Sequence, residues 1–261
     1  MPTRSGNPAF EGPPAEFRYD GHSAAALAML LGVPGVELLR SVASTLDRAH
    51  ELAAAGAPAG TLVLADMQTA GRGRQGRRWH SEPGRGIWLT LIERPDDAAA
   101  LDVLSLRVGL YAARALDEVA PAKIRLKWPN DLFVRDAKLA GVLVEARWRE
   151  GAVDWVAIGV GLNVRAPTLM PTAAALQPGM TRLSALGRLV PALRDAARRT
   201  GPLDSAELAA FAERDLARRR RCREPLTGTV AGIDPSGALI VNTPRGLRTA
   251  RTGSLVFQED L

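Results

Sequence analysis

Cysteine is almost absent from this 261-residue sequence, in which Cys222 is the only thiol. A single cysteine excludes an intramolecular disulfide and a zinc site built from several thiolates. Long hydrophobic runs are missing as well, since no apolar stretch reaches the roughly 20 residues that a membrane-spanning helix needs. The first residues also lack the pattern of a signal peptide. We therefore expect a cytoplasmic protein without a membrane partner.

Lysine and asparagine are scarce although the sequence is basic. Lysine occurs only at positions 123, 127 and 138 among 34 lysines and arginines, and asparagine only at positions 7, 130, 163 and 242. Two of these lysines and one asparagine fall within residues 127–138. Arginine spreads its charge over a planar group, whereas lysine carries a compact charge at the end of a slim stem. The composition hints that residues 127–138 need the shape of lysine.

The overall composition is that of a folded protein with a moderate positive charge. Hydrophobic residues make up 46% of the chain, which is enough for one larger domain and a small one. The formal net charge of +6 suits an acidic partner, but it is modest for a dedicated nucleic-acid-binding protein. We therefore do not expect DNA as a partner.

The most unusual stretch is Q-T-A-G-R-G-R-Q-G-R-R-W, residues 68–79, in which three glycines alternate with four arginines. Glycine lets the backbone approach a bound group closely, and the arginine guanidinium fits phosphate or carboxylate. The alternatives are a flexible basic loop and an arginine-rich arm that binds nucleic acid. Residues 61–66 and 86–92, on either side, both have the pattern of buried strands. A loop held between two core strands is positioned, which favours an anion-binding active-site loop.

The order of helix and strand patterns predicts an α+β protein. We expect a short helix at residues 22–34, a helix at residues 44–55 capped by hydroxyls, and a long amphipathic helix at residues 98–119. Strand patterns occupy residues 36–40, 61–66, 86–92, 124–128, 132–135, 139–148 and 153–161. Helices and strands do not alternate as in a repeating βαβ array, so the sheet should be mixed or mainly antiparallel, with helices packed against it.

Three regions are predicted along the chain. Residues 1–35 are expected to be a flexible N-terminal segment, residues 36–222 the larger domain and residues 223–261 a small β domain. Within the larger domain, residues 181–221 have a helical pattern with a basic end at residues 218–221. That basic run is expected to be a solvated helix terminus. The small domain contains short β-type runs separated by D-P-S-G and T-P-R-G turns, typical of a small barrel.

Three further polar segments lie at predicted strand ends. K-W-P-N-D (residues 127–131) places a cation, an amide and a carboxylate in one turn, K-L-A-G (residues 138–141) places a lysine beside small residues, and G-V-G-L-N (residues 159–163) ends a buried strand in an amide. Each alone is compatible with ordinary turn chemistry, and for Asn130 this is the leading alternative. Together with residues 68–79, they predict a site for an anion next to a small organic group.

The segments A-G-R-G-R-Q-G-R-R-W, K-W-P-N-D, K-L-A-G-V-L-V-E and G-V-G-L-N resemble, in order and spacing, the motifs of the biotin–protein ligases, also called biotin–acetyl-CoA-carboxylase ligases. The resemblance extends from about residue 36 to the C-terminus. It implies a catalytic domain like that of class II aminoacyl-tRNA synthetases at residues 36–222, followed by an SH3-like barrel at residues 223–261. We expect no counterpart of the N-terminal winged helix that the repressor-type members have.

The resemblance implies an enzyme with ATP and biotin as substrates and Mg²⁺ as cofactor. The carboxylate of biotin would attack the α-phosphate of ATP to give biotinyl-5′-adenylate and pyrophosphate. A lysine of a biotin carboxyl carrier domain, as in acetyl-CoA carboxylase, would then attack this mixed anhydride. Because the first step brings two anions together, arginine, lysine and Mg²⁺ must screen their charges.

The family motifs also imply roles for individual residues. The catalytic residues would be Lys138, Arg74 and Arg72, lying against the reacting carboxylate and phosphate. Biotin would be bound by Ser44, Thr45, Gln68, Gly71, Arg72, Gly73, Arg74, Lys138 and Gly141. ATP would be bound by Arg74, Arg77, Trp79, Asn130, Asp131, Lys138 and Asn163, with Asp131 holding Mg²⁺ directly or indirectly. Lys127 would support Asp131, and residues 71–80 would order over the adenylate.

One position departs from the family pattern. The family usually reads Ser-Thr-Asn where this chain has Ser44, Thr45 and Leu46, so the contacts to the biotin head must differ. His80 and Glu82 are taken as surface residues. The rival interpretations are a lipoate or octanoate ligase-like enzyme of the same fold, and a basic nucleic-acid-binding protein that uses residues 72–78 and 218–221.

Overall fold

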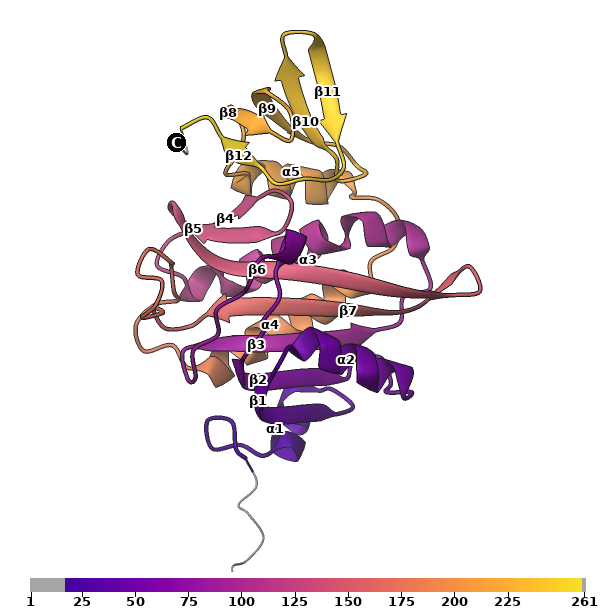
Figure 1. The fold of residues 1–261 in the computed structure, drawn as a ribbon, viewed down its shortest axis with the longest axis vertical. Helices are drawn as coiled ribbons and strands as arrows, with labels where there is room; N and C mark the ends of the chain where they lie inside the picture. Colours follow the sequence, from indigo (N-terminus) through magenta and orange to yellow (C-terminus); the bar gives the residue numbers. More distant parts are fainter. Residues whose placement is uncertain (1–16, 260–261) are drawn as a thin grey trace, which may run out of the picture.

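The structure, a computed structural model, describes residues 17–259. Its larger part is a seven-stranded sheet with the order β1-β2-β3-β7-β6-β5-β4 (Figure 1). The strands are β1 (Val36–Val42), β2 (Leu62–Gln68), β3 (Gly86–Glu93), β4 (Ile124–Lys127), β5 (Asp131–Val134), β6 (Ala137–Arg149) and β7 (Ala152–Asn163). The pair β1–β2 is parallel and the other neighbouring pairs are antiparallel. This confirms the predicted mixed sheet.

Alternating side chains along the central strands build a core on each face of the sheet. On β7, Val156, Ile158 and Val160 belong to one core, whereas Trp155 and Ala157 belong to the other. The larger core is covered by α1 (Ala24–Leu31), α3 (Leu101–Leu116) and α4 (Arg182–Ala197), and the smaller by α2 (Thr45–Ala54). In Figure 1, α3 and α4 lie behind the sheet and α2 lies in front of it. The part of the front face beside α2 holds the pocket described below.

The helix ends follow ordinary capping chemistry. The Ser44 hydroxyl accepts a hydrogen bond from the Leu46 N–H at 3.3 Å, which starts α2 where the sequence predicted it. The long helix predicted at residues 98–119 is confirmed as α3 flanked by the short 3₁₀ turns η2 (Ala98–Ala100) and η3 (Asp117–Val119). The helix α5 (Ser205–Arg214) begins with a capping box between Asp204 and Glu207. None of the helices that the structure describes is long and apolar enough to cross a membrane.

The segment before β1 is packed against the main domain, so the expected flexibility of residues 1–35 is wrong for residues 17–35. Tyr19 is fully buried, and its hydroxyl donates to the Gly86 carbonyl at 3.2 Å. The Arg182 guanidinium lies over the Tyr19 ring, 3.9 Å from its centre, and forms ion pairs with Asp20 and Asp66. These partners are far away in the chain, which is why local composition did not reveal them. Residues 1–16 lie outside the described residues.

The C-terminal part is a five-stranded antiparallel sheet with the order β11-β10-β9-β8-β12. Its strands are β8 (Arg221–Glu224), β9 (Gly228–Ile233), β10 (Leu239–Thr243), β11 (Gly246–Ala250) and β12 (Val256–Phe257). Strand β8 was not predicted, and the basic run at residues 218–221 is not a helix terminus, because α5 already ends at Arg214. The backbone becomes extended at Asp215, and the N–H of the next residue, Leu216, donates to the Leu126 carbonyl at 2.9 Å. Pairing with β4 therefore ends the helix earlier than its sequence pattern suggests.

Candidate active site

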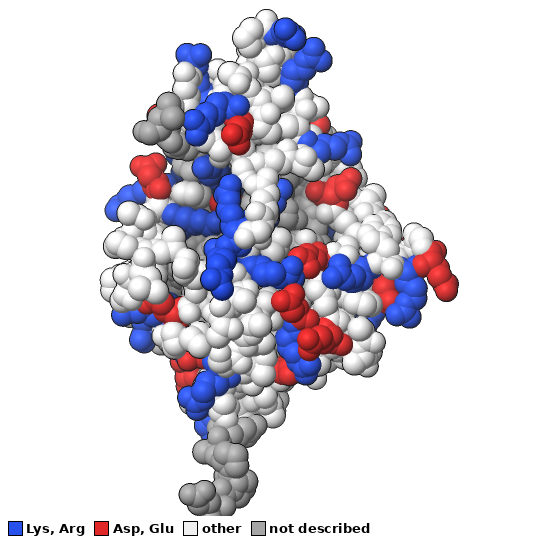
Figure 2. Space-filling view, viewed as in Figure 1, with Lys and Arg blue, Asp and Glu red and all other residues white. Residues whose placement is uncertain are grey.

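A pocket opens on the front face of the main sheet, between the start of α2, residues 72–79, the β4–β5 hairpin and the C-terminal segment at residues 254–255. Figure 2 shows lysine and arginine side chains gathered at the centre of this face. Most of the predicted site residues line the pocket: Ser44, Thr45, Gln68, Arg72, Gly73, Arg74, Arg77, Trp79, Asn130, Asp131, Lys138 and Gly141. Four segments that are distant in the sequence are thus brought together.

Two predicted site residues do not line the pocket. The Asn163 side chain is buried and donates to the Ala174 carbonyl at 3.1 Å, so it holds the segment that follows β7. Gly71 gives the loop its tight closure, because a Cβ there would lie 2.6 Å from the Trp79 carbonyl oxygen. Both residues therefore hold segments around the pocket in place without lining it.

The floor of the pocket near α2 is a chain of hydrogen-bonded polar groups. The Gln68 Oε1 accepts from the Thr45 N–H at 2.8 Å and from the Thr45 hydroxyl at 3.0 Å. The Thr90 hydroxyl donates to the Thr45 hydroxyl oxygen at 2.9 Å, and the Gln68 Nε2 donates to the Ser81 hydroxyl at 3.2 Å. Thr90 was missed by the sequence analysis, although it is a lone hydroxyl in an apolar strand. These hydrogen bonds between protein groups hold the side chains of the pocket floor in place.

Leu46 fills the position where the family pattern has asparagine. It is buried on α2, and its Cδ1 would lie 3.3 Å from a Cβ added to Gly159. Leu143 lines the pocket beside these two residues. This end of the pocket therefore combines a hydrocarbon wall with the hydroxyls of Ser44 and Thr45.

The arginine–glycine loop forms a narrow hairpin. The Gly73 N–H donates to the Arg77 carbonyl at 2.7 Å, and the Trp79 N–H donates to the Gly71 carbonyl at 2.8 Å. Its tip is a single 3₁₀ turn, η1 (Arg74–Gly76), in which Gln75 has a φ of +55°. This left-handed conformation is uncommon for a residue with a side chain, so neighbouring groups must hold the tip in place.

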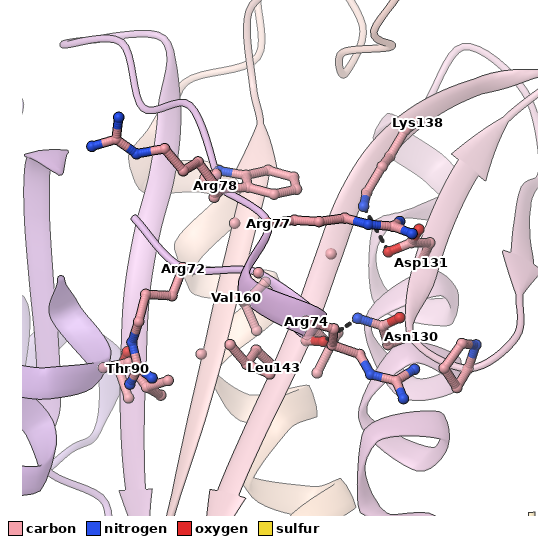
Figure 3. A pocket seen from close by; sticks show the side chains of 18 of the residues that line it. Arg72, Arg74, Arg77, Arg78, Thr90, Asn130, Asp131, Lys138, Leu143 and Val160 are labelled. Atoms are coloured by element: carbon pink, nitrogen blue, oxygen red, sulfur yellow. Dashed lines mark hydrogen bonds and ion pairs between the residues drawn. The ribbon is translucent and has the colours of Figure 1, made fainter. Parts of the chain in front are cut away.

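The arginines of this loop point in different directions. In Figure 3, Arg77 extends toward Asp131 and Lys138, Arg74 extends toward Asn130, and Arg72 turns the other way. Within residues 17–259 the Arg74 guanidinium has no carboxylate at ion-pair distance. Desolvation lowers the pKa of Arg74, the charge of Arg77 acts in the same direction, and Asp131 opposes both. Arg74 is therefore a partly buried cation without a paired anion among these residues.

The β4–β5 hairpin and the start of β6 carry the second set of charged groups. The Lys138 Nζ lies 2.7 Å from the Asp131 Oδ1 and 5.2 Å from the centre of the Trp79 ring. The Asn130 Nδ2 donates to the Val142 carbonyl at 2.6 Å, which ties the hairpin turn to β6. The turn is thus rigid, and it places the amide of Asn130 and the carboxylate of Asp131, together with Lys138 from β6, beside the arginines of the loop (Figure 3).

The C-terminal sheet also contributes to the pocket. The Ser254 hydroxyl accepts from the Arg77 Nη2 at 3.2 Å and donates to the Gln75 Oε1 at 2.7 Å. The Lys127 Nζ lies 4.7 Å from the centre of the Phe257 ring. Ser254 and Leu255 line the pocket but were not predicted, because no local pattern connects them with the loop. The expectation that Lys127 supports Asp131 stays a prediction.

His80 and Glu82 follow the loop. His80 is exposed, as expected of a surface residue. Glu82 has a structural role instead, because its carboxylate accepts from the Leu169 N–H at 2.9 Å and from the Thr168 N–H at 3.1 Å. These hydrogen bonds, that of Leu169 above all, lower the pKa of the Glu82 carboxyl. Glu82 thereby fastens the segment after β7 to the end of the loop.

A divalent cation fits this donor set only in part. Among residues 17–259, no group of three or more histidine, cysteine, aspartate or glutamate side chains is arranged to hold a metal ion. Asp131 offers a carboxylate at the pocket wall, where Asn130 also lines the pocket. Mg²⁺ is commonly bound by one or two carboxylates together with substrate phosphates. Asp131 is thus compatible with a cation that arrives with a nucleotide.

Comparison with known proteins shows which family this chain resembles. A profile of the Biotin/lipoate A/B protein ligase family matches residues 38–163. The biotin--[acetyl-CoA-carboxylase] ligase of Paracoccus denitrificans is 35% identical over 221 residues, which cover 75% of this chain and 89% of that protein. The bifunctional ligase/repressor BirA of Bacillus subtilis (strain 168) is 44% identical over 124 residues, which cover 47% of this chain. The match spans only 38% of the length of that BirA and 36% of the BirA of Escherichia coli (strain K12).

Solved structures give the same grouping. The biotin protein ligase from Aquifex aeolicus in complex with biotin and ATP aligns with a TM-score of 0.67 and 26% sequence identity, over 85% of this chain and 98% of that chain. The alignment covers 85% of this chain, whose main sheet is mixed, so the α+β fold expected from the sequence is confirmed. On the strength of its similarity across most of the Paracoccus ligase, this chain belongs to the biotin/lipoate A/B protein ligase family.

Proposed function

We propose that this protein activates biotin with ATP to form biotinyl-5′-AMP and transfers the biotinyl group to a specific lysine of a biotin carboxyl carrier domain. The observation that supports this best is the unpaired Arg74 cation beside the Lys138–Asp131 pair, within one pocket that also holds a fixed polar floor. The biotin carboxylate and the ATP phosphates are both anions, so cations must screen their charges when they meet. The polar ring system of biotin requires hydrogen-bonding groups such as those of the pocket floor. The Paracoccus and Aquifex proteins, which carry the name of this activity, are consistent with it.

The polar floor is suited to the biotin head. A ureido group has two N–H donors and one carbonyl acceptor, and Ser44, Thr45 and Gln68 offer both kinds of partner at the pocket wall. Leu46 and Gly159 would contact the hydrocarbon part of the rings. The dithiolane of lipoate has no N–H or C=O, so it could form no such hydrogen bonds with these polar groups and would bind less favourably against them. This contrast favours biotin over lipoate or octanoate.

In the first step, a biotin carboxylate oxygen attacks the α-phosphorus of ATP and pyrophosphate leaves. Lys138 and Arg74 would bind the carboxylate and the α-phosphate, and Arg77 would bind the nucleotide phosphates. When ATP is bound, Mg²⁺ would neutralise phosphate charge, held by Asp131 directly or through water. Trp79 and Asn130 would border the nucleotide, whereas Asn163 would act indirectly through the segment it fixes.

In the second step, the ε-amine of the carrier lysine attacks the biotinyl carbonyl carbon and AMP leaves. Before that, residues 71–80 would cover the adenylate and exclude water, because a mixed anhydride hydrolyses readily. Gly73 and Gly141 would allow the backbone to approach the ligand closely. The catalytic domain would comprise residues 36–222 and the C-terminal domain residues 223–261, in a protein that works in the cytoplasm.

The test is pyrophosphate release from ATP with biotin, with lipoate and without either, followed by transfer of labelled biotin to a carrier domain. We expect release that depends on biotin and label on one carrier lysine. Thermal unfolding provides a second measurement, because biotin with ATP should raise the melting temperature more than lipoate with ATP. Pyrophosphate release with lipoate but not with biotin would show that biotin is not the substrate. Binding of duplex DNA that weakens steeply with salt would support the nucleic-acid alternative.

A further inference from the structure

The Arg72 guanidinium is held by carboxylates from two different elements. Its Nη1 and Nη2 lie 2.8 and 3.1 Å from the two carboxylate oxygens of Glu145 on β6, and Nη2 lies 2.8 Å from the Asp47 Oδ1 on α2. Two negative charges thus surround one positive charge. A carboxylate or phosphate that approached this guanidinium would be repelled more by the two carboxylates, Asp47 and Glu145, than it is attracted by the single guanidinium. Arg72 is therefore poorly suited to bind an anion in this arrangement.

Glu145 is itself fixed by a histidine. The His50 Nε2 lies 2.9 Å from the Glu145 Oε2, and the Trp155 Nε1 lies 3.0 Å from the His50 Nδ1. An indole N–H can only donate, so His50 Nδ1 accepts and the proton on Nε2 points at Glu145. Desolvation acts to raise the pKa of Glu145, but the hydrogen bonds from Arg72 and His50 together bring it below its usual value. Glu145 is thus charged at neutral pH and held on two sides.

Arg72 occupies a stem position of the loop. Its backbone pairs with Arg78 across the hairpin, and the Gly73–Arg77 hydrogen bond follows directly. Holding the side chain of a stem residue therefore limits how the whole hairpin can turn. Figure 3 shows the result, with Arg72 directed away from Lys138 and the tip arginines directed toward the β4–β5 hairpin.

We propose that Arg72 is a positioning residue, anchored by Asp47 and Glu145, which presents Arg74 and Arg77 to the reacting groups without touching them itself. The anchor fixes part of the loop before ligand binds, so less conformational entropy is lost when the loop closes. It also neutralises one of four clustered arginines. Its catalytic consequence rests on the proposed function, whereas its effect on the loop does not.

The structural half is tested in the ligand-free, full-length protein by amide hydrogen exchange at residues 72–79. Glu145→Gln keeps the side-chain shape and removes the charge. We expect exchange to become faster on the order of tenfold, because a charge-assisted pair becomes weaker neutral hydrogen bonds. Glu51→Gln is the matched control, since Glu51 also pairs with an arginine on α2 but is 64% exposed and forms its ion pair with Arg48 rather than with Arg72; it should change nothing in the loop. Unchanged exchange in Glu145→Gln would overturn the inference.

A double-mutant cycle tests the catalytic half, with biotin-dependent pyrophosphate release as the assay. Arg72→Met and Glu145→Gln should each raise the KM for biotin on the order of tenfold with a smaller change in kcat, and the double variant should cost no more than Arg72→Met alone. Costs that multiply would show that Arg72 acts on the ligand directly, against the inference. If a thermal unfolding experiment shows that Glu145→Gln is not folded, Asp47→Asn replaces it in both experiments, because the Asp47 side chain is 54% exposed. Because the exchange experiment contains no ligand, its result stands even if biotin proves not to be the substrate.

Discussion

The Trp79 indole lies across Gly161 of β7, so close that a Cβ on this glycine would overlap the ring. Gly141 of β6 pairs with Gly161 in the sheet, and a Cβ there would lie 3.1 Å from the Trp79 Cζ3. Two paired glycines on adjacent strands therefore form a shallow seat for one aromatic ring. The indole Nε1 in this seat is buried and has no hydrogen-bond partner within residues 17–259. The loop thus depends on the sheet surface for the position of its last residue.

Gly161→Ala should displace Trp79 and disorder the pocket wall. Overfilling a packed site of this kind typically costs about 1–3 kcal/mol, and here the indole must move because the strand backbone cannot. We expect a lower melting temperature and at least a severalfold weaker affinity for biotin in the presence of ATP, measured by calorimetry. Gly35→Ala is the control, because a Cβ at Gly35 meets no atom within 4 Å. Equal affinity in both variants would argue that Trp79 is not part of the ligand site.

Ser254→Ala should loosen the loop tip without unfolding the C-terminal sheet. The change removes hydrogen bonds to Gln75 and Arg77, and the left-handed Gln75 loses a restraint. At a surface position the free energy of unfolding should change by less than about 0.5 kcal/mol. Amide exchange at residues 74–77 should nevertheless become faster. Ser236→Ala removes a hydroxyl bonded to Asp234 in the same domain and should leave the loop unaffected; equal exchange in both variants would show that Ser254 does not restrain the tip.

The sequence predicted the elements well and the contacts between them poorly. Strand and helix patterns located the main sheet, and the spacing of polar segments brought Gln68, Asn130 and Lys138 to one pocket. Each of these signals is local, because periodicity and turn chemistry act over a few residues. The fold class follows from such signals when they agree with one another.

The missed features all depend on partners far away in the chain. Arg72 meets Glu145, and Gln75 meets Ser254, only after the sheet and the C-terminal domain have formed. Tyr19 lies in a segment whose composition suggested flexibility, yet burial under Arg182 orders it. Residues 218–221 read as a helix end because their charge fits one, and pairing of Leu216 with Leu126 overrides that preference. Tertiary contacts therefore decide what local patterns leave open.

Arg74→Gly should release the activated intermediate. Arg74 is the partly buried cation whose charge is not paired within residues 17–259, so it is available to hold the mixed anhydride. Its loss should still permit biotin-dependent pyrophosphate release but let the adenylate escape and react with lysines elsewhere. The measurement is biotin label on a bystander protein that lacks a carrier domain. Label no higher than with the unmodified enzyme would count against retention as the role of Arg74.

Lys138→Arg should greatly slow adenylate formation, although arginine is the usual cation of this chain. The Lys138 ammonium is confined between the Asp131 carboxylate at 2.7 Å and the Trp79 ring, and a Cβ on Gly141 would lie 3.4 Å from it. A guanidinium is wider and carries its charge over a plane, so it cannot take the same place beside the carboxylate and the α-phosphate. A misplacement of about 1 Å can cost on the order of a hundredfold in rate. We expect a loss of that size in adenylate formation at saturating biotin and ATP.

Lys123→Arg is the control for this substitution, and the comparison decides whether the scarcity of lysine has meaning. The Lys123 side chain is 54% exposed and lies 3.6 Å from a Glu213 that is itself 70% exposed. A guanidinium fits there without rearrangement, and exposed ion pairs contribute about 0–1 kcal/mol, so both rate and melting temperature should stay unchanged. If Lys138→Arg also keeps most of the activity while remaining folded, the shape of the cation is irrelevant at this position. Charge alone would then account for Lys138, and the confinement by Asp131 and Trp79 would have no catalytic consequence.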